Sequence, residues 1–129
     1  LGVCVGMQIL ADSSEEGVCE GLGYISGEVR TIDNNKEEQL DLPHMGWNKI
    51  MPTNKEDLMW SNINSLRGFY FLHSYHFVPQ DDKHIFSSTF YGETFVSAVK
   101  KGNIYGFQFH PEKSHENGIS LLKNFSQVS

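Results

Sequence analysis

The stretch "GVCVG" at residues 2–6 constrains the fold of this chain more than any other, because it sets a cysteine between two glycines just before a helical segment. The spacing G-x-C-x-G is typical of a nucleophile elbow, a strained strand-to-helix turn that needs small residues two positions before and after the nucleophile. We therefore expect an α/β fold with Cys4 at the amino end of a helix. There the helix dipole and free N–H groups favour a thiolate and can hold an oxyanion. These five residues alone leave open a small core cysteine between two turn glycines.

The rest of the chain reads as one domain, residues 1–129, because no repeat, low-complexity tract or internal linker divides it. Residues 5–11 predict a short helix that ends in the polar stretch "DSSEEG", and residues 33–38 predict a polar loop. Aromatic and β-branched residues between Gly or Asn turns predict strands at 24–32, 44–50, 68–78, 84–92, 93–102 and 103–109.

The carboxy-terminal stretch 114–128 predicts a helix, with Ser114 as N-cap and with Ile119, Leu122 and Phe125 at helical spacing. We expect a mixed sheet, because the strands from Gly68 onward form antiparallel hairpins while the elbow strand belongs to a parallel part.

A catalytic thiol needs a base, and His110 is the best candidate among six histidines. It ends the strand "NIYGFQF" and precedes Pro111, which favours an extended conformation at His110. Residues two apart in an extended chain project to the same side, so Glu112 can reach the imidazole and orient it. A surface turn with a chance His-Pro-Glu sequence is the alternative.

The other histidines carry weaker signals. His73 and His76 lie three apart in one expected strand, where they point to opposite faces and make a poor metal pair. His44, His84 and His115 stand in turn-like or polar surroundings, where a solvated side chain is expected.

Composition narrows the partners. Ten Lys and Arg against sixteen Asp and Glu give a net charge of −6. The sequence has no cluster of Lys and Arg that could bind along a phosphate backbone, so a nucleic-acid partner is not expected. No apolar run reaches the length of a membrane helix, so no membrane contact is expected either. Only Cys4 and Cys19 are present, which favours a reduced, cytoplasmic setting over a disulfide framework.

The segments "GVCVGMQ" and "FHPEKS" together resemble the two signatures of class I, triad-type glutamine amidotransferases. The elbow, the helix-borne glutamine, the late histidine and the glutamate two residues on occur in the family's order and distance. The resemblance covers essentially the whole chain and narrows to the branch that serves histidine biosynthesis, through "SSEEG", "GLGYISGEV", "PHMGWN", "YFLHSY" and "GNIYGFQFHPEKS". It implies a flavodoxin-like α/β fold whose mixed sheet has flanking helices, and it implies no cofactor and no metal.

The resemblance also implies roles for individual residues. Cys4 would attack the side-chain amide of L-glutamine, His110 would protonate the departing ammonia, and Glu112 would orient His110. Water would then hydrolyse the glutamyl thioester to glutamate.

The substrate contacts implied by the family are five. The N–H of Val5 matches one oxyanion donor, and Gln8, four residues after Cys4, matches an amide that contacts the substrate. Glu16 resembles the acidic residue that meets the substrate's amino group, and Ser74 and Tyr75 match the segment at its other end. A solvated helix residue is the alternative for Gln8, and a capping charge is the alternative for Glu16.

Trp47, in "PHMGWN", and Lys113 match the family's partner-facing positions. The partner implied is a (β/α)8-barrel cyclase subunit that receives ammonia through its interior. A core tryptophan is the alternative for Trp47.

Family members carry several strands and helices upstream of the cysteine, together with a glycine-rich loop that gives a second oxyanion donor. This chain begins at Leu1, so we expect it to be the carboxy-terminal part of a longer protein with little activity alone. Two further hypotheses stay open: a paralogous amidotransferase for surface-sugar biosynthesis, and a non-catalytic fragment that keeps only the partner-binding face.

Overall fold

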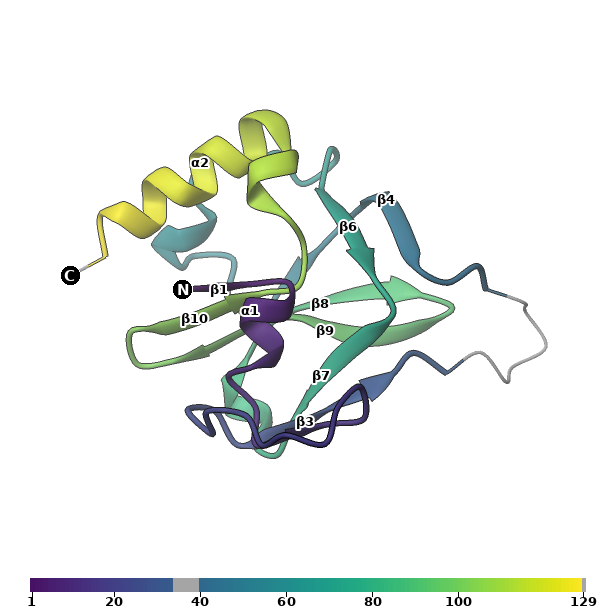
Figure 1. Ribbon diagram of the computed structural model, residues 1–129. Coiled ribbons are helices and arrows are strands. Elements are labelled where there is room, and N and C mark those ends of the chain that lie inside the picture. The colour runs from purple at the N-terminus through teal and green to yellow at the C-terminus, as the bar shows by residue number, and fades with distance from the viewer. Residues whose placement is uncertain (34–39, 129) are drawn as a thin grey trace.

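The computed structural model describes residues 1–33 and 40–128 (Figure 1). Two α-helices and three 3-10 helices accompany ten strands in this part of the chain. The helices are α1 (Val5–Gln8), α2 (His115–Ser126), η1 (Leu58–Trp60), η2 (Asp82–His84) and η3 (Pro111–Lys113). The strands are β1 (Gly2–Val3), β2 (Ser13–Ser14), β3 (Gly27–Thr31), β4 (His44–Asn48), β5 (Met51–Pro52), β6 (Phe69–His73), β7 (Tyr75–Pro79), β8 (Ile85–Tyr91), β9 (Glu93–Lys101) and β10 (Ile104–Phe107). Most of the loop predicted at 33–38 lies outside the described residues.

The main sheet is mixed, as predicted. Its order is β1-β10-β9-β7-β3-β2, with β8 paired to β9 and β5 to β8. The pairs β1–β10 and β2–β3 are parallel, and the other pairs are antiparallel. The hairpins β8–β9 and β9–β10 turn at Gly92 and Gly102, both of which have a positive φ that glycine adopts without strain. Parallel pairing therefore places the elbow strand beside the last strand of the sheet.

The strand predicted at 68–78 is wrong as a single strand. It breaks at Ser74 into β6, which pairs with β4 in a separate two-stranded sheet, and β7, which pairs with β3 and β9 in the main sheet. No glycine or proline marks the break, so local sequence gives no sign of it. The backbone around Ser74 consequently joins the two sheets beside the elbow.

Alternation along β10 assigns its residues to two cores on opposite faces of the sheet. Tyr105 and Phe107 belong to the larger, aromatic cluster, which also contains Leu121 of α2. Gly106 faces the other way and lies against Met7 of α1, in the smaller cluster. Since side chains alternate along an extended chain, the residues that follow on the Gly106 side are directed toward α1.

The helix α1 is shorter than the predicted 5–11. After Gln8 the backbone turns through hydrogen bonds three residues apart, from Leu10 N–H to the Met7 carbonyl and from Ala11 N–H to the Gln8 carbonyl. Tighter bonding of this kind ends the α-helix.

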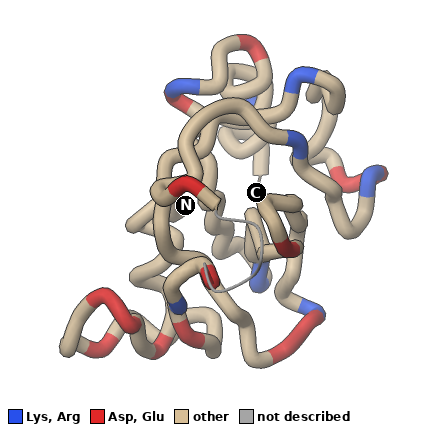
Figure 2. The backbone as a smooth tube through the Cα atoms, turned by 90° about the vertical axis from the view of Figure 1, so that its right-hand side faces the viewer, with Lys and Arg blue, Asp and Glu red and all other residues tan. Residues whose placement is uncertain are grey.

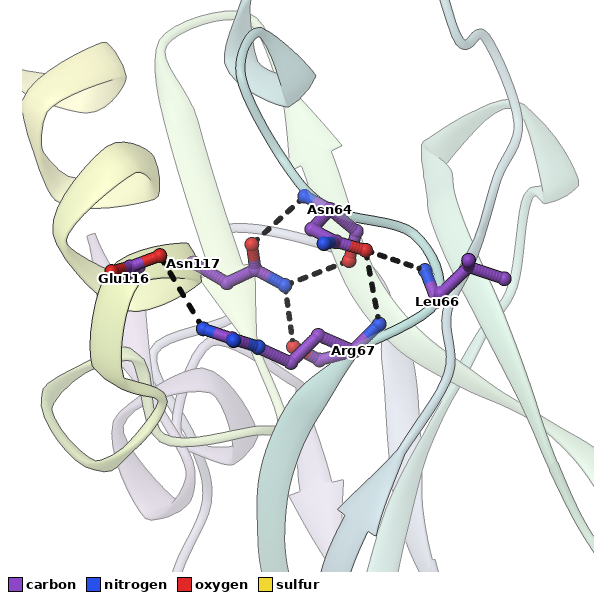
Figure 3. Close-up of polar contacts among 6 residues, drawn as sticks. Asn64, Leu66, Arg67, Glu116 and Asn117 are labelled. Carbon is purple, nitrogen blue, oxygen red and sulfur yellow. Dashed lines mark hydrogen bonds and ion pairs between the residues drawn. The ribbon is translucent and has the colours of Figure 1, made fainter.

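The helix α2 follows the predicted range closely, but a different face is buried. Asn117, Gly118 and Leu121 are buried, whereas Ile119 and Leu122 are 69% and 39% exposed. Figure 3 shows the reason, because Asn117 on the buried face exchanges hydrogen bonds with the loop before β6. Its Oδ1 accepts from Asn64 N–H at 2.8 Å, and its Nδ2 donates to the carbonyls of Asn64 and Gly68 at 2.9 and 2.7 Å.

The cations of the described chain are scattered among acidic residues rather than gathered in one stripe (Figure 2). None of the helices in residues 1–33 and 40–128 has the length and apolar character needed to cross a membrane.

Candidate active site

The elbow has the strained geometry that its spacing predicts. Cys4 has φ 54° and ψ −111°, values that a residue other than glycine rarely adopts. Its N–H donates to the Phe107 carbonyl at 2.8 Å, which continues the parallel ladder of β1 and β10. A Cβ on Gly2 would lie 2.2 Å from the Gly6 carbonyl oxygen, so only glycine fits there.

The expectation for Gly6 is wrong. A Cβ added to Gly6 would meet nothing within 4 Å. The clash in this turn arises on one side only, because the Gly6 carbonyl points back toward Gly2 while its own Cα faces open space.

The thiol of Cys4 is half-buried between two polar groups. It donates to the Leu72 carbonyl oxygen at 3.6 Å and accepts from Nε2 of Gln108 at 3.7 Å. Both contacts come from segments of the chain far from the elbow in sequence.

The prediction that the helix start favours a thiolate does not describe the net effect. Burial raises the pKa of the Cys4 thiol and is the largest influence on it. The Val5 N–H and the Gln108 amide lower this pKa, but the carboxylates of Glu112 and Glu16 raise it. Because α1 is only one turn long, the effect of the helix start does not offset burial. The thiol therefore stays protonated in the free protein unless a base removes the proton.

His110 and Glu112 form a hydrogen-bonded pair through Nδ1 and Oε1. His110 is extended, as expected beside a proline, but Glu112 reaches it from the 3-10 helix η3 rather than from an extended strand. The backbone of His110 is fixed at both ends, since its N–H donates to the Tyr70 carbonyl at 2.8 Å and its carbonyl accepts from Ser114 Oγ at 2.6 Å. Ser114 precedes α2 as predicted, yet its hydroxyl serves this contact and does not cap the helix.

Cys4 and His110 come to the same end of two adjacent parallel strands. Cys4 follows β1, and His110 lies beyond the end of β10 on the side of Gly106 and Gln108. Among the described residues, no hydrogen bond joins the thiol to the imidazole, and the thiol donates to Leu72 instead. A free enzyme tolerates such a loose arrangement, so the triad stays a prediction.

Gln8 is not the solvated helix residue that was the alternative for it. It is 9% exposed, and its Nε2 donates to the Tyr75 carbonyl at 3.3 Å and to Oε1 of Gln108 at 3.1 Å. Its amide group thus joins the elbow helix to the junction between β6 and β7.

A pocket of about 240 Å³ opens beside the elbow and contains three of the predicted substrate residues: Val5, Gln8 and Glu16. Glu16 is exposed there, on a loop that also places the thiol of Cys19 in the pocket wall. Ser74 and Tyr75 are half-buried at the junction between β6 and β7. The Tyr75 carbonyl accepts a hydrogen bond from Gln8, which lines the pocket. A substrate amide bound at the elbow would therefore have polar groups on two sides.

Trp47 is a surface residue and not a core tryptophan. It is 43% exposed on β4 and packs its ring against Tyr70 and His115. Lys113 is exposed in η3, immediately after Glu112.

His44 is wrongly expected to be solvated. It is 5% exposed, and its Nδ1 lies 2.9 Å from Nε2 of His73, which is equally buried. The Tyr75 carbonyl, 2.8 Å from Nδ1 of His73, can only accept, so His73 carries its proton on Nδ1. His44 must then donate through its own Nδ1, and its Nε2 accepts from Asn48 at 3.3 Å. The two neutral rings therefore form an ordered pair across β4 and β6.

We expect this pair to make stability depend on pH. Burial lowers the pKa of each ring to about 4, below the ordinary 6.5. The unfolded chain binds protons first as pH falls, so stability is full above about pH 6.5 and is lost toward pH 4. The free energy of unfolding in urea should fall by roughly 2 kcal/mol for each ring, or about 4 kcal/mol for the pair, between pH 7 and pH 5.

The double variant His44→Gln/His73→Gln should lose the part of the pH dependence that these two rings contribute, and His76, whose pKa burial also lowers, should keep the remainder. The exposed histidine variant His115→Ala should keep the full pH dependence. An equal slope in the double variant and in the unchanged protein would contradict the assignment.

No group of three or more potential metal ligands occurs among the residues that the structure describes. The site as described offers sulfur, imidazole and amide chemistry.

A family model, "Glutamine amidotransferase class-I", matches residues 1–128. The chain belongs to the class-I glutamine amidotransferase family. Two of its relatives, both named imidazole glycerol phosphate synthase subunit HisH, come from Leptospira borgpetersenii and Sulfurimonas denitrificans. They are 48% and 49% identical to the amidotransferase chain over 99% and 98% of its length. The chain spans 63% and 61% of these relatives' own lengths.

A solved structure of a Thermoplasma acidophilum protein, described as a GMP synthase subunit, has the same fold. The likeness covers 96% of this chain and 53% of that one, with a TM-score of 0.64 and 21% sequence identity. The predicted amidotransferase fold is thus confirmed.

One residue of this site escaped the sequence analysis. Gln108 is fully buried and contacts both Cys4 and Gln8. Its place in "YGFQFH", where phenylalanines flank it, was the only available signal, since a polar residue inside an apolar strand needs a partner.

Proposed function

We propose that the protein containing this chain is the glutaminase subunit of imidazole glycerol phosphate synthase, and that it releases ammonia from L-glutamine for histidine biosynthesis. The observation that carries this proposal is the match of nearly the whole chain, at 48–49% identity, to relatives of that name. Those names favour this assignment over a surface-sugar paralogue. A biosynthetic enzyme of this kind with two free cysteines is expected in the cytoplasm.

In the proposed reaction Cys4 is the nucleophile and His110 moves the protons. The thiol proton passes to the imidazole as sulfur adds to the amide carbon of glutamine. The tetrahedral intermediate then expels ammonia, which takes that proton, and leaves a glutamyl thioester. Water attacks the thioester with His110 as base, and glutamate departs as the thiol is restored. Glu112, bonded to Nδ1 of His110, fixes the tautomer that leaves Nε2 free for these transfers.

The raised pKa of the Cys4 thiol supports these roles of Cys4 as nucleophile and His110 as base. Because the free thiol is protonated at neutral pH, a base is needed at the moment of attack. The developing oxyanion would accept from the Val5 N–H, which lies next to the sulfur in the elbow.

Substrate binding would use the pocket beside the elbow. Glu16 is exposed at its wall and offers a carboxylate to the amino group of glutamine. The junction at Ser74 and Tyr75 would meet the other end of the substrate. The side-chain NH₂ group of Gln8 already donates two hydrogen bonds within the protein. Donation to the substrate would require one of these bonds to break.

The proposed partner is a (β/α)8-barrel cyclase subunit. Trp47 supports this, because an exposed tryptophan beside Tyr70 and His115 is a suitable interface anchor. Lys113 is exposed two residues before the start of α2 and carries a charge that an acidic partner group could meet.

Covalent trapping tests the proposed nucleophile. The glutamine analogue 6-diazo-5-oxo-L-norleucine alkylates a thiol that attacks it, so the full-length protein should become labelled on Cys4. Cys19 is an internal control, since it is a free and exposed cysteine in the wall of the pocket beside the elbow. Peptide mass spectrometry should find the label on Cys4 alone, with protection by excess L-glutamine. Equal labelling of both cysteines, or none, would contradict the assignment and favour a non-catalytic interaction module.

A further inference from the structure

Two buried glutamines connect the Cys4 sulfur to the backbone carbonyl of Tyr75, at the junction between β6 and β7. Gln108 is fully buried and Gln8 is 9% exposed. The hydrogen bonds run from Gln108 Nε2 to Cys4 Sγ, from Gln8 Nε2 to Gln108 Oε1, and from Gln8 Nε2 to the Tyr75 carbonyl. Because both side chains are shielded from solvent, neither amide group can easily rotate to exchange its oxygen and nitrogen.

The Tyr75 carbonyl fixes the direction of every bond in this series. A carbonyl only accepts, so Gln8 must present its NH₂ group to it. The second hydrogen of that NH₂ group points at Gln108, which must therefore present its oxygen to Gln8. The remaining end of the Gln108 amide, its NH₂ group, then faces the sulfur. Either amide flipped alone would set like groups against each other.

The sulfur is thereby offered one acceptor and one fixed side-chain donor. In the thiol form, S–H donates to the Leu72 carbonyl at 3.6 Å. Once the proton leaves, that carbonyl repels the negative sulfur, while the N–H of Gln108 at 3.7 Å attracts it. Hydrogen bonds to a charged group are roughly twice as strong as those between neutral groups.

We propose that Gln108 is a positioning residue, which holds the Cys4 thiolate through an N–H whose direction is set by Gln8 and the Tyr75 carbonyl. The inference rests on the proposed function, in which Cys4 is the nucleophile. Gln108 does not touch the reacting carbon; it acts on the charge and direction of the sulfur. The lowering effect of its amide on the thiol pKa is consistent with this role.

The test uses the full-length protein with its synthase partner and reads Cys4 in two ways. One measurement is the pH midpoint of Cys4 alkylation by iodoacetamide, resolved from Cys19 by peptide mass spectrometry. The other is the steady-state rate of glutamate release. Gln108→Met has nearly the same volume and no donor. It should raise the alkylation midpoint by about one pH unit and lower kcat about ten-fold, with KM for glutamine within two-fold.

Gln108→Glu is the second variant, and it preserves the shape of the side chain. One carboxylate oxygen still accepts from Gln8, while the other replaces the donor that faces the sulfur. The alkylation midpoint should therefore rise further than in Gln108→Met. If Gln108→Met fails to fold, as judged by circular dichroism, this variant decides the question.

Thr89→Val is the matched control. Thr89 is fully buried in β8, and its hydroxyl has no hydrogen-bond partner in the described part of the chain. Its replacement should leave the alkylation midpoint and kcat unchanged. An unshifted midpoint in folded Gln108→Met or Gln108→Glu protein would overturn the proposal.

Failure of the proposed function gives a different result. If Cys4→Ala still released glutamate, Cys4 would not be the nucleophile, whatever the alkylation midpoints. A dead Cys4→Ala protein together with an unshifted Gln108→Met midpoint would refute the positioning role alone.

Discussion

Replacing Cys4 with alanine should abolish glutamate release by the full-length complex, with a loss of about 10⁵–10⁶ in kcat. The reaction proposed here proceeds through a thioester, and no other thiol in the described residues follows a strand at an elbow. The exposed Cys19 should not take over, because it lies on the loop between β2 and β3 and not at the elbow. Glutamate can be followed continuously with glutamate dehydrogenase.

Cys19→Ala is the control for loss of a thiol as such, and it should retain kcat within a factor of two. The isolated 129-residue chain should also release glutamate negligibly. The proposed mechanism gives this chain, which spans 63% and 61% of its relatives' lengths, only the Val5 N–H as an oxyanion donor. Lack of a second donor would cost roughly 2.7–4 kcal/mol, or 10²–10³ in rate. Undiminished activity of the Cys4→Ala complex would refute the mechanism. Robust turnover by the isolated chain would refute the expected need for a second donor.

The substitution Gly118→Ala should disrupt the packing that holds α2 against the segment of His110 and Glu112. A Cβ on Gly118 would lie 1.7 Å from the Pro111 carbonyl oxygen and 2.6 Å from its carbon, and both atoms are backbone. The helix must therefore move away from Pro111. We expect a loss of about 3 kcal/mol in the free energy of unfolding. A fall of about 10² in kcat should accompany it, since Pro111 lies between His110 and Glu112.

Ile119→Ala, one residue further along α2, is the control. Ile119 is 69% exposed, so its truncation should change stability by no more than about 0.5 kcal/mol. Urea unfolding of both variants and glutamate release by both complexes provide the comparison. A Gly118→Ala protein as stable as Ile119→Ala would show that the helix can shift without cost.

The elbow and the mixed sheet could be predicted because their signals are local. The spacing of Gly2 and Cys4 is set by steric contacts within one turn. The hairpins are predicted by glycines at their turns, such as Gly92 and Gly102. The elbow predicted that its strand has a parallel neighbour, but it did not predict that this neighbour is β10.

The errors arose where distant segments decide the environment. His44 looks solvated in "PHMGWN", yet its partner His73 lies 29 positions away on the neighbouring strand. Gln108 was missed because its neighbours Phe107 and Phe109 suggest one buried face, whereas both faces of that segment are covered. Local periodicity cannot reveal a contact between a strand and an elbow at opposite ends of the sequence.

The pairing of β1 with β10 also bears on when the thiol becomes competent during synthesis. Cys4 is synthesised before Gln108, which holds its sulfur and lies 104 positions later in the sequence. This loop can close only after β10 has been synthesised, and contacts of such sequence separation form late in folding. A nascent or prematurely terminated chain that lacks β10 has neither the strand that shapes the elbow nor His110. Under the proposed mechanism, an unfinished polypeptide without β10 would therefore not hydrolyse glutamine.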